Sequence, residues 1–185
     1  MNHEAQLASK IATETNIIVA KCYQCGKCSA GCPLATDMDV TSSAILRLLQ
    51  YNTEATDTEV LRSNAIWLCL SCDMCYSRCP NQIDIPGVMD LLRQESVRQG
   101  CTNAAARNIV RFHRSFLDVV QQTGRSFEMG MVLDYKWRSK RWFDDLALAP
   151  RMFLKGKLRL LPEVVKKRKE ILRLFKRTLF LRKNV

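Results

Sequence analysis

Two four-cysteine runs constrain the fold of this chain more than any other feature of its sequence. Both runs have the spacing Cys-x2-Cys-x2-Cys-x3-Cys-Pro. They account for eight of the nine cysteines: Cys22, Cys25, Cys28, Cys32, Cys69, Cys72, Cys75 and Cys79. A fold that uses these thiols must twice bring three of them into one tight loop, and must place a fourth directly before Pro33 or Pro80.

This spacing is typical of chains that bind two 4Fe–4S clusters, in which the last cysteine of each run ligates the cluster of the other run. The first three thiolates hold three corners of one cube, and the fourth cannot easily fold back to it. We therefore predict two 4Fe–4S clusters with crossed ligation. Cluster site 1 would consist of Cys22, Cys25, Cys28 and Cys79, and cluster site 2 of Cys69, Cys72, Cys75 and Cys32.

Zinc and disulfide bonds explain the same cysteines less well. A tetrahedral zinc site typically uses two Cys-x2-Cys pairs, not three cysteines in succession with a fourth before proline. Disulfides fit an odd cysteine count poorly. The N-terminus also does not resemble a signal peptide, because Glu4 stands where positive charge is wanted and residues 17–20 form too short an apolar stretch. We therefore expect iron-bound thiolates in a reducing or anaerobic cytoplasm, and no transmembrane segment, because no apolar run approaches about 18 residues.

Helical periodicity dominates the rest of the chain, which predicts a mainly α fold. We expect helices over residues 41–51, 56–67, 86–100 and 103–122, and a weaker helical pattern over 2–20. The second of these begins at a capping-box signature at Thr56, and Gly124 is the expected C-cap of the fourth. The apolar stripe of that fourth helix, which predicts a core or an interface with another protein, comprises Ile109, Phe112, Phe116 and Val119.

Positive charge is concentrated at the C-terminal end. Residues 1–150 contain 16 basic and 16 acidic residues, whereas residues 151–185 contain 13 basic residues and only Glu163 and Glu170 as acids. The segment 126–161 is rich in aromatic residues and methionine, and a basic amphipathic helix is expected from Pro162 to about residue 182. We predict a cluster domain over 1–124 and a C-terminal extension over 125–185. The extension favours docking onto an acidic partner protein of the same complex. The alternatives are binding to a membrane surface and binding to nucleic acid.

The two cysteine runs separated by a helical insertion resemble the helical ferredoxin module of several iron–sulfur subunits. The whole chain is similar to the C subunit of heterodisulfide reductase. The resemblance is carried by CYQCGKCSAGCP at 22–33, WLCLSCDMCYSRCP at 67–80, IDIPGVM at 83–89 and LAPRMFLKGKLRLLPE at 148–163. It implies an electron-transfer role between a flavin-containing A subunit and a disulfide-reducing B subunit with noncubane clusters. It also implies a role in flavin-based electron bifurcation, and two alternatives stay open: an iron–sulfur subunit of a membrane-associated dehydrogenase that feeds quinone, and a nucleic-acid-binding iron–sulfur protein.

The residues outside the two runs indicate no catalytic chemistry of their own. His3 and His113 are isolated, and no acid, base or nucleophile constellation accompanies them. Cys101 lies outside both runs and is expected to be a small buried apolar residue. We therefore expect a non-catalytic subunit of an oxidoreductase that transfers single electrons.

The charges beside the two cluster sites differ. Lys27 lies in the first loop and Arg78 precedes Cys79, so both would lie near site 1, whereas Asp73 lies in the loop of site 2. Positive charge stabilises a reduced cluster. This pattern predicts the higher reduction potential for the cluster at site 1.

Overall fold

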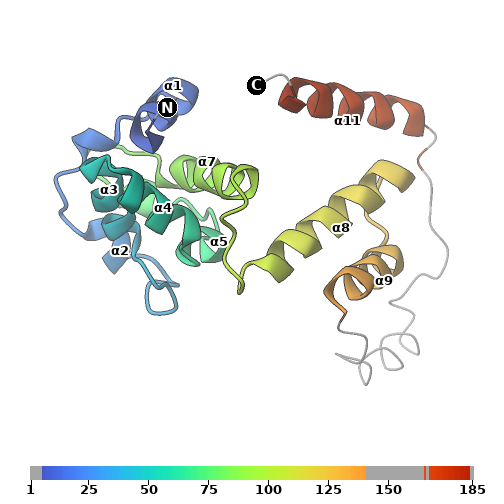
Figure 1. Cartoon of the computed structure of the whole chain (residues 1–185), viewed down its shortest axis with the longest axis horizontal. Coiled ribbons are helices and arrows are strands. Elements are labelled where there is room, and N and C mark those ends of the chain that lie inside the picture. The colour runs from blue at the N-terminus through green and yellow to red at the C-terminus, as the bar shows by residue number, and fades with distance from the viewer. Residues whose placement is uncertain (1–5, 141–164, 166, 184–185) are drawn as a thin grey trace. The chain divides into compact units, whose positions relative to one another are not determined.

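The computed structural model describes residues 6–140, 165 and 167–183, and these residues fold into helices without a strand (Figure 1). The prediction of a mainly α fold is therefore confirmed. Contacts divide the chain into two compact units, Met1–Ala106 and Arg107–Val185. The predicted division of function after residue 124 stays a prediction, and it differs from this structural division by the helix that begins at Arg107.

The first unit contains both cysteine runs, and short helices surround them. These elements are α1 (Leu7–Thr15), η1 (Val19–Lys21), α2 (Lys27–Ala30), α3 (Ser42–Tyr51), α4 (Glu54–Arg62), α5 (Ala65–Leu68), α6 (Met74–Arg78) and α7 (Ile85–Arg98). Helix α7, green in Figure 1, contacts α1, α4, α5 and α6. The largest fully buried apolar side chains between them are Ile11, Ile45, Leu46, Leu49, Leu61, Ile66, Ile85, Met89 and Leu92. Full burial of one such side chain contributes about 1.5–3 kcal/mol, so this core holds the helices that carry the cysteines.

Local signals determine most helix boundaries in the first unit. Helix α3 confirms the helix expected over 41–51, and α7 confirms the one expected from Pro86. The prediction of one helix from Thr56 to Trp67 was wrong in two respects: the helix starts earlier, and it is interrupted. The chain enters α4 earlier, at Thr53, whose Oγ1 accepts a hydrogen bond from the Thr56 N–H at 3.3 Å. Thr56 is therefore the second half of the capping box, because its hydroxyl accepts from the Thr53 N–H in return. The chain leaves the helical conformation at Ser63 before it forms α5.

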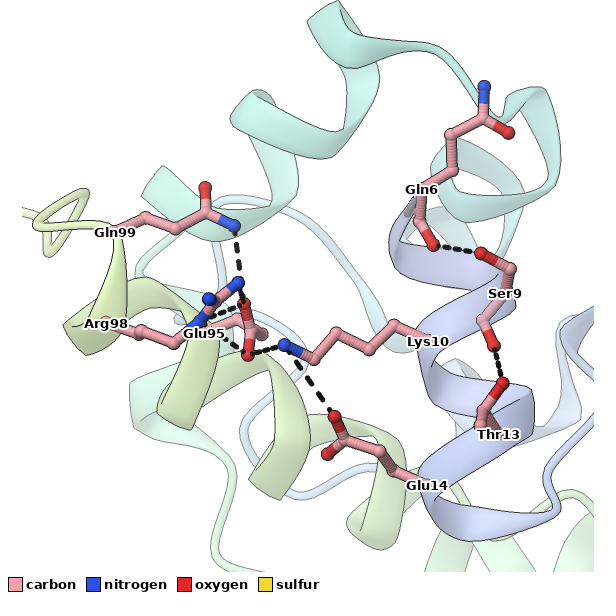
Figure 2. A network of polar contacts seen from close by, with 8 residues as sticks. All are labelled: Gln6, Ser9, Lys10, Thr13, Glu14, Glu95, Arg98 and Gln99. Atoms are coloured by element: carbon pink, nitrogen blue, oxygen red, sulfur yellow. Dashed lines mark hydrogen bonds and ion pairs between the residues drawn. The ribbon is translucent and has the colours of Figure 1, made fainter. Parts of the chain in front are cut away.

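Helix α1 is tied to α7 by a buried ion pair (Figure 2). Lys10 Nζ lies 2.5 Å from Glu95 Oε1, and the side chain of Glu95 is only 6% exposed. Arg98, one turn further along α7, donates to the other carboxylate oxygen of Glu95 at 2.7 Å. Leu7 and Ile11 of α1 are buried as the weak pattern predicted, but Ile18 lies beyond the end of the helix and is 48% exposed.

The second unit contains α8 (Arg107–Thr123), α9 (Glu128–Ser139) and α11 (Arg168–Lys183). Helix α8 ends at Gly124, whose φ of +85° confirms the expected C-cap. In the predicted stripe of α8, Val119 is buried, whereas Phe112 and Phe116 are each 41% exposed. Helix α9 was not predicted, because its apolar residues do not form a stripe. It is held to α8 by Arg138, whose guanidinium lies 2.7 Å from Asp118 Oδ2.

Several predictions fall on segments outside the described residues. They include the aromatic and methionine residues after position 140, the 148–163 segment and the expected helix start at Pro162. The basic helix appears as α11, and it begins only at Arg168, because neither Val165 nor Lys167 is helical. Among the helices of the described segments, none is long and apolar enough to cross a membrane.

Candidate metal centre

The two cysteine runs adopt the same local structure twice. Corresponding residues lie 47 positions apart, as between Cys22 and Cys69. Each run follows a one-turn helix, η1 or α5, and continues into a short helix, α2 or α6. In each run the residue before the second cysteine and the residue after it have positive φ: Gln24 (62°) and Gly26 (73°) in the first run, and Ser71 (50°) and Asp73 (60°) in the second. Turns of this kind direct successive backbone N–H groups inward, and iron–sulfur sites use such concavities.

A small cavity brings together the four cysteines expected at site 2. Its lining includes Cys32, Cys69, Cys72 and Cys75. The last cysteine of the first run thus lies with the first three cysteines of the second run. The remaining lining is almost entirely apolar and consists of Pro33, Leu34, Ser42, Leu70 and Met74. The donor set therefore fits a four-thiolate cluster with mostly apolar neighbours.

Around site 1, Tyr23 lies beside three of the expected cysteines. Desolvation, followed by the nearby thiolates of Cys25, Cys79 and Cys22, raises the pKa of the Tyr23 phenol above its usual range. Cys79 of the second run thus acts on the same phenol as Cys22 and Cys25 of the first run. This is the counterpart of the arrangement at site 2.

Two sulfur atoms of site 1 accept hydrogen bonds from nitrogen donors. The side-chain amide of Gln24 donates to Cys22 Sγ at 3.3 Å. The backbone N–H of Ile83 donates to Cys79 Sγ at 3.4 Å. Hydrogen bonds to the sulfurs help to set the reduction potential of an iron–sulfur cluster.

Helices α2 and α6 pack against each other and bring the two sites together. Cys28 on α2 is buried, and burial raises the pKa of its thiol. Burial likewise raises the pKa of Cys75 on α6 to about 11, and the nearby thiolates of Cys69 and Cys28 add to this. A buried thiol of this kind becomes a thiolate only when a cation compensates its charge, so binding of iron here would release protons.

The all-cysteine donor sets fit 4Fe–4S clusters. Within the described part of the chain, no three His, Cys, Asp or Glu side chains converge as they would around one metal ion. A zinc ion holds its thiolates at about 2.3 Å from a common centre. Each thiolate of a cubane binds a different iron, so the sulfurs lie further apart, which agrees with a cavity that four cysteines line.

Three residues that the sequence did not single out hold the cysteine loops from a distance. Gln50 and Arg93 donate hydrogen bonds to backbone carbonyls at the start of each run. Asp39 accepts hydrogen bonds from the N–H groups of Asn64 (2.7 Å) and Ala65 (2.8 Å), and thereby caps α5, which leads into Cys69. Each contact joins residues at least 24 positions apart, so no local sequence signal could have revealed it.

The basic residues Lys27 and Arg78, on which the predicted order of potentials was based, do not both act on site 1 alone. Lys27 is exposed, so solvent screens its charge. A Cβ atom on Gly31 would lie 2.5 Å from Cδ and Nε of Arg78, so the Arg78 side chain lies against the residue before Cys32. Arg78 is therefore next to ligands of both sites. The predicted order of potentials stays a prediction.

The remaining candidate residues are His113, His3 and Cys101. His113 is exposed on α8, and His3 lies outside the described residues. Cys101 is only partly buried, and its Sγ lies 3.7 Å from the carbonyl oxygen of Gln99.

Comparisons with known proteins agree with this geometry. Residues 18–83, which include both runs, match the 4Fe–4S dicluster domain family. The chain is 29% identical over 163 residues to the C subunit of the ferredoxin:CoB-CoM heterodisulfide reductase of Methanosarcina mazei, and this match covers 88% of this chain and 84% of that protein. It is 29% identical over 109 residues to the iron–sulfur C subunit of the CoB–CoM heterodisulfide reductase of Methanopyrus kandleri, and this match covers 58% of this chain and 55% of that protein.

A third relative shows a higher identity over a shorter region. The C subunit of the ferredoxin:CoB-CoM heterodisulfide reductase of Methanosarcina acetivorans is 34% identical over 97 residues, which cover 52% of this chain and 38% of that protein. The matches to Methanopyrus kandleri and Methanosarcina acetivorans thus span about half or less of those relatives. The chain contains a 4Fe–4S dicluster domain for two 4Fe–4S clusters and is similar to the C subunits of heterodisulfide reductases.

Proposed function

We propose that this chain is an electron-transfer subunit of a heterodisulfide-reductase-like complex. The observation that carries the proposal is the packing of α2 against α6, which brings the two cysteine runs side by side within one small unit. Two adjacent clusters form a path for single electrons. The similarity to the C subunits of methanogen heterodisulfide reductases supports the same function.

The ligands of the two clusters are the eight cysteines of the runs. Site 1 comprises Cys22, Cys25, Cys28 and Cys79, and site 2 comprises Cys69, Cys72, Cys75 and Cys32. The cavity lined by all four cysteines of site 2 and the position of Cys79 near Cys22 and Cys25 support these assignments. When bound, each cluster supplies one-electron redox chemistry. The protein supplies the thiolates, the N–H groups and the apolar surroundings.

The partners we propose are a flavin-containing A subunit and a disulfide-reducing B subunit of the same complex. The chain itself would carry electrons between them in the cytoplasm and perform no bond chemistry. Residues 125–185 would form the docking extension. On the described part of α11, the basic residues Lys169, Arg173, Lys176 and Arg177 are exposed, whereas Ile171, Leu172 and Phe175 are partly buried. An amphipathic basic helix of this kind suits an acidic partner with an apolar centre.

Anaerobic purification of the affinity-tagged chain from its own cells tests this proposal. We expect about eight irons per chain, together with a flavoprotein and a second cysteine-rich protein in stoichiometric amounts. Both clusters should be reduced by the electron donor of the complex and reoxidised by the disulfide substrate of the B subunit. Co-purification of a quinone-reducing membrane protein would instead support the dehydrogenase alternative. Bound nucleic acid together with clusters that stay unchanged during turnover would contradict electron transfer.

A further inference from the structure

Gln50 on α3 clamps the start of the first cysteine run. Its Nε2 donates to the carbonyl oxygen of Val19 at 3.2 Å and to that of Cys22 at 2.7 Å. These carbonyls belong to the first residue of η1 and to the first ligand of site 1. The side chain therefore fixes the backbone at the point where the first run begins.

Arg93 on α7 makes the corresponding clamp in the second run. Its Nε donates to the carbonyl oxygen of Ile66, and its Nη2 donates to that of Cys69. Ile66 and Cys69 each lie 47 positions after the two carbonyls that Gln50 holds. The equivalent carbonyl oxygens of the two runs are thus held by side chains from different helices.

The two clamps differ in charge. The amide of Gln50 is neutral, whereas a guanidinium stays protonated at every accessible pH. The Arg93 side chain is only 20% exposed, so water screens its charge incompletely. Its counter-charge, Asp90, lies 2.6 Å from Nη1 but is 58% exposed. At site 1 the exposed Arg47 donates to Oε1 of Gln50 at 3.4 Å, so the neutral amide itself holds the two carbonyl oxygens.

We propose that Arg93 selectively raises the reduction potential of the cluster at site 2, and that Gln50 is its neutral counterpart at site 1. A four-thiolate cluster carries a charge of about −2 when oxidised and about −3 after it accepts one electron. A partly buried cation held at the backbone of Cys69 favours the more negative state. Arg93 is thus a positioning residue that also sets potential. This inference rests on the ligand sets proposed above.

The test is an anaerobic redox titration of the full chain followed by electron paramagnetic resonance, with dithionite as the electron donor. Arg93→Gln copies the side chain found at site 1: it removes the charge and leaves an amide donor on a shorter side chain. At a fixed solution potential, we expect the reduced-to-oxidised ratio at site 2 to fall by up to about tenfold, or about 59 mV for a one-electron couple. The ratio at site 1 should stay unchanged, and Arg93→Lys should restore most of the ratio at site 2.

Two further variants separate charge from backbone geometry. Gln50→Leu removes both hydrogen bonds of the neutral clamp, and it should leave the potential of site 1 nearly unchanged. Asp90→Asn removes the exposed counter-charge, and it should raise the potential of site 2 slightly even if Arg93 variants fold poorly. With both clusters present, the inference is overturned if neither Arg93→Gln nor Asp90→Asn changes the potential of site 2. It is also overturned if Gln50→Leu shifts the potential of site 1 as far as Arg93→Gln shifts that of site 2. Iron well below eight per chain, in the unsubstituted protein, would instead contradict the proposed ligand sets.

Discussion

Lys10 Nζ and Glu95 Oε1 lie 2.5 Å apart, and this pair is the polar link between α1 and α7 (Figure 2). Burial alone would raise the pKa of Glu95, but hydrogen bonds from Arg98 and Lys10, and their positive charges, lower it below its ordinary value. The charged carboxylate is therefore favoured in the folded protein. Its contribution to stability is complete above the ordinary pKa of a glutamate and is lost as the pH falls through the lowered value.

Replacement of this carboxylate should destabilise the first unit. We expect Glu95→Gln to lower the free energy of unfolding at pH 7 by about 1–3 kcal/mol, because the partly buried ammonium of Lys10 and the Arg98 guanidinium lose a buried charged acceptor. Guanidinium unfolding followed by circular dichroism measures this loss. Glu14→Gln is the matched control, since Glu14 also pairs with Lys10, at 3.6 Å, but is 44% exposed. The loss should shrink below about pH 4; equal losses for both variants would contradict the proposed importance of burial.

Crossed ligation predicts that loss of the fourth cysteine of one run affects the cluster of the other run. Cys32 belongs to the first run, but we expect Cys32→Ser to change the electron paramagnetic resonance signal of the cluster at site 2, which Cys69, Cys72 and Cys75 would hold. Cys79→Ser should change the signal of the other cluster. Cys101→Ser is the control, and it should leave iron content and both signals as they are. If each substitution affected the cluster of its own run, the ligand sets would have to be redrawn.

Hydrogen bonds to sulfur, rather than the exposed lysine, should favour reduction at site 1. Gln24→Ala removes the amide that donates to Cys22 Sγ. We expect the midpoint potential of that cluster to fall by about 20–60 mV, the one-electron equivalent of about 0.5–1.5 kcal/mol for one hydrogen bond. Lys27→Gln should change the midpoint much less, because Lys27 is exposed. The opposite ranking in a redox titration would restore the charge-based explanation.

Gly124 in the second unit and Gly100 in the first unit both have positive φ, so they offer a matched pair of variants. Gly124 has a φ of +85°, and a Cβ atom there would lie 3.0 Å from both Val165 and Ile171. Gly100 has a φ of +67° with open space around it. Gly100→Ala should therefore cost only the backbone strain, about 1 kcal/mol. Gly124→Ala should cost more and should loosen α11 from α8, which limited proteolysis of the two variants would detect as faster cleavage near residue 165. Equal cleavage would show that α11 accommodates the methyl group.

The sequence predicted those parts of the fold and site that depend on local patterns. The spacing of the cysteines predicts the ligand set of site 2, and the cavity lined by Cys32, Cys69, Cys72 and Cys75 agrees with it. Pro86 and Gly124 marked helix ends through their own backbone preferences. The contacts of Gln50 and Arg93 could not be predicted, since they depend on how α3 and α7 pack. Helix α9 was missed because its partner is α8 and its own apolar residues lack a helical stripe.

The proposed exchange of one cysteine between the two runs would also determine how the protein loses its clusters. Because Cys32 lies with the second run and Cys79 near the first, neither half of the first unit holds a complete set of thiols. Oxidative loss of one cluster would free a cysteine that is covalently part of the loop around the other. We expect damage to spread from one centre to the next, so that partly loaded chains are short-lived and the population consists of intact and fully stripped molecules.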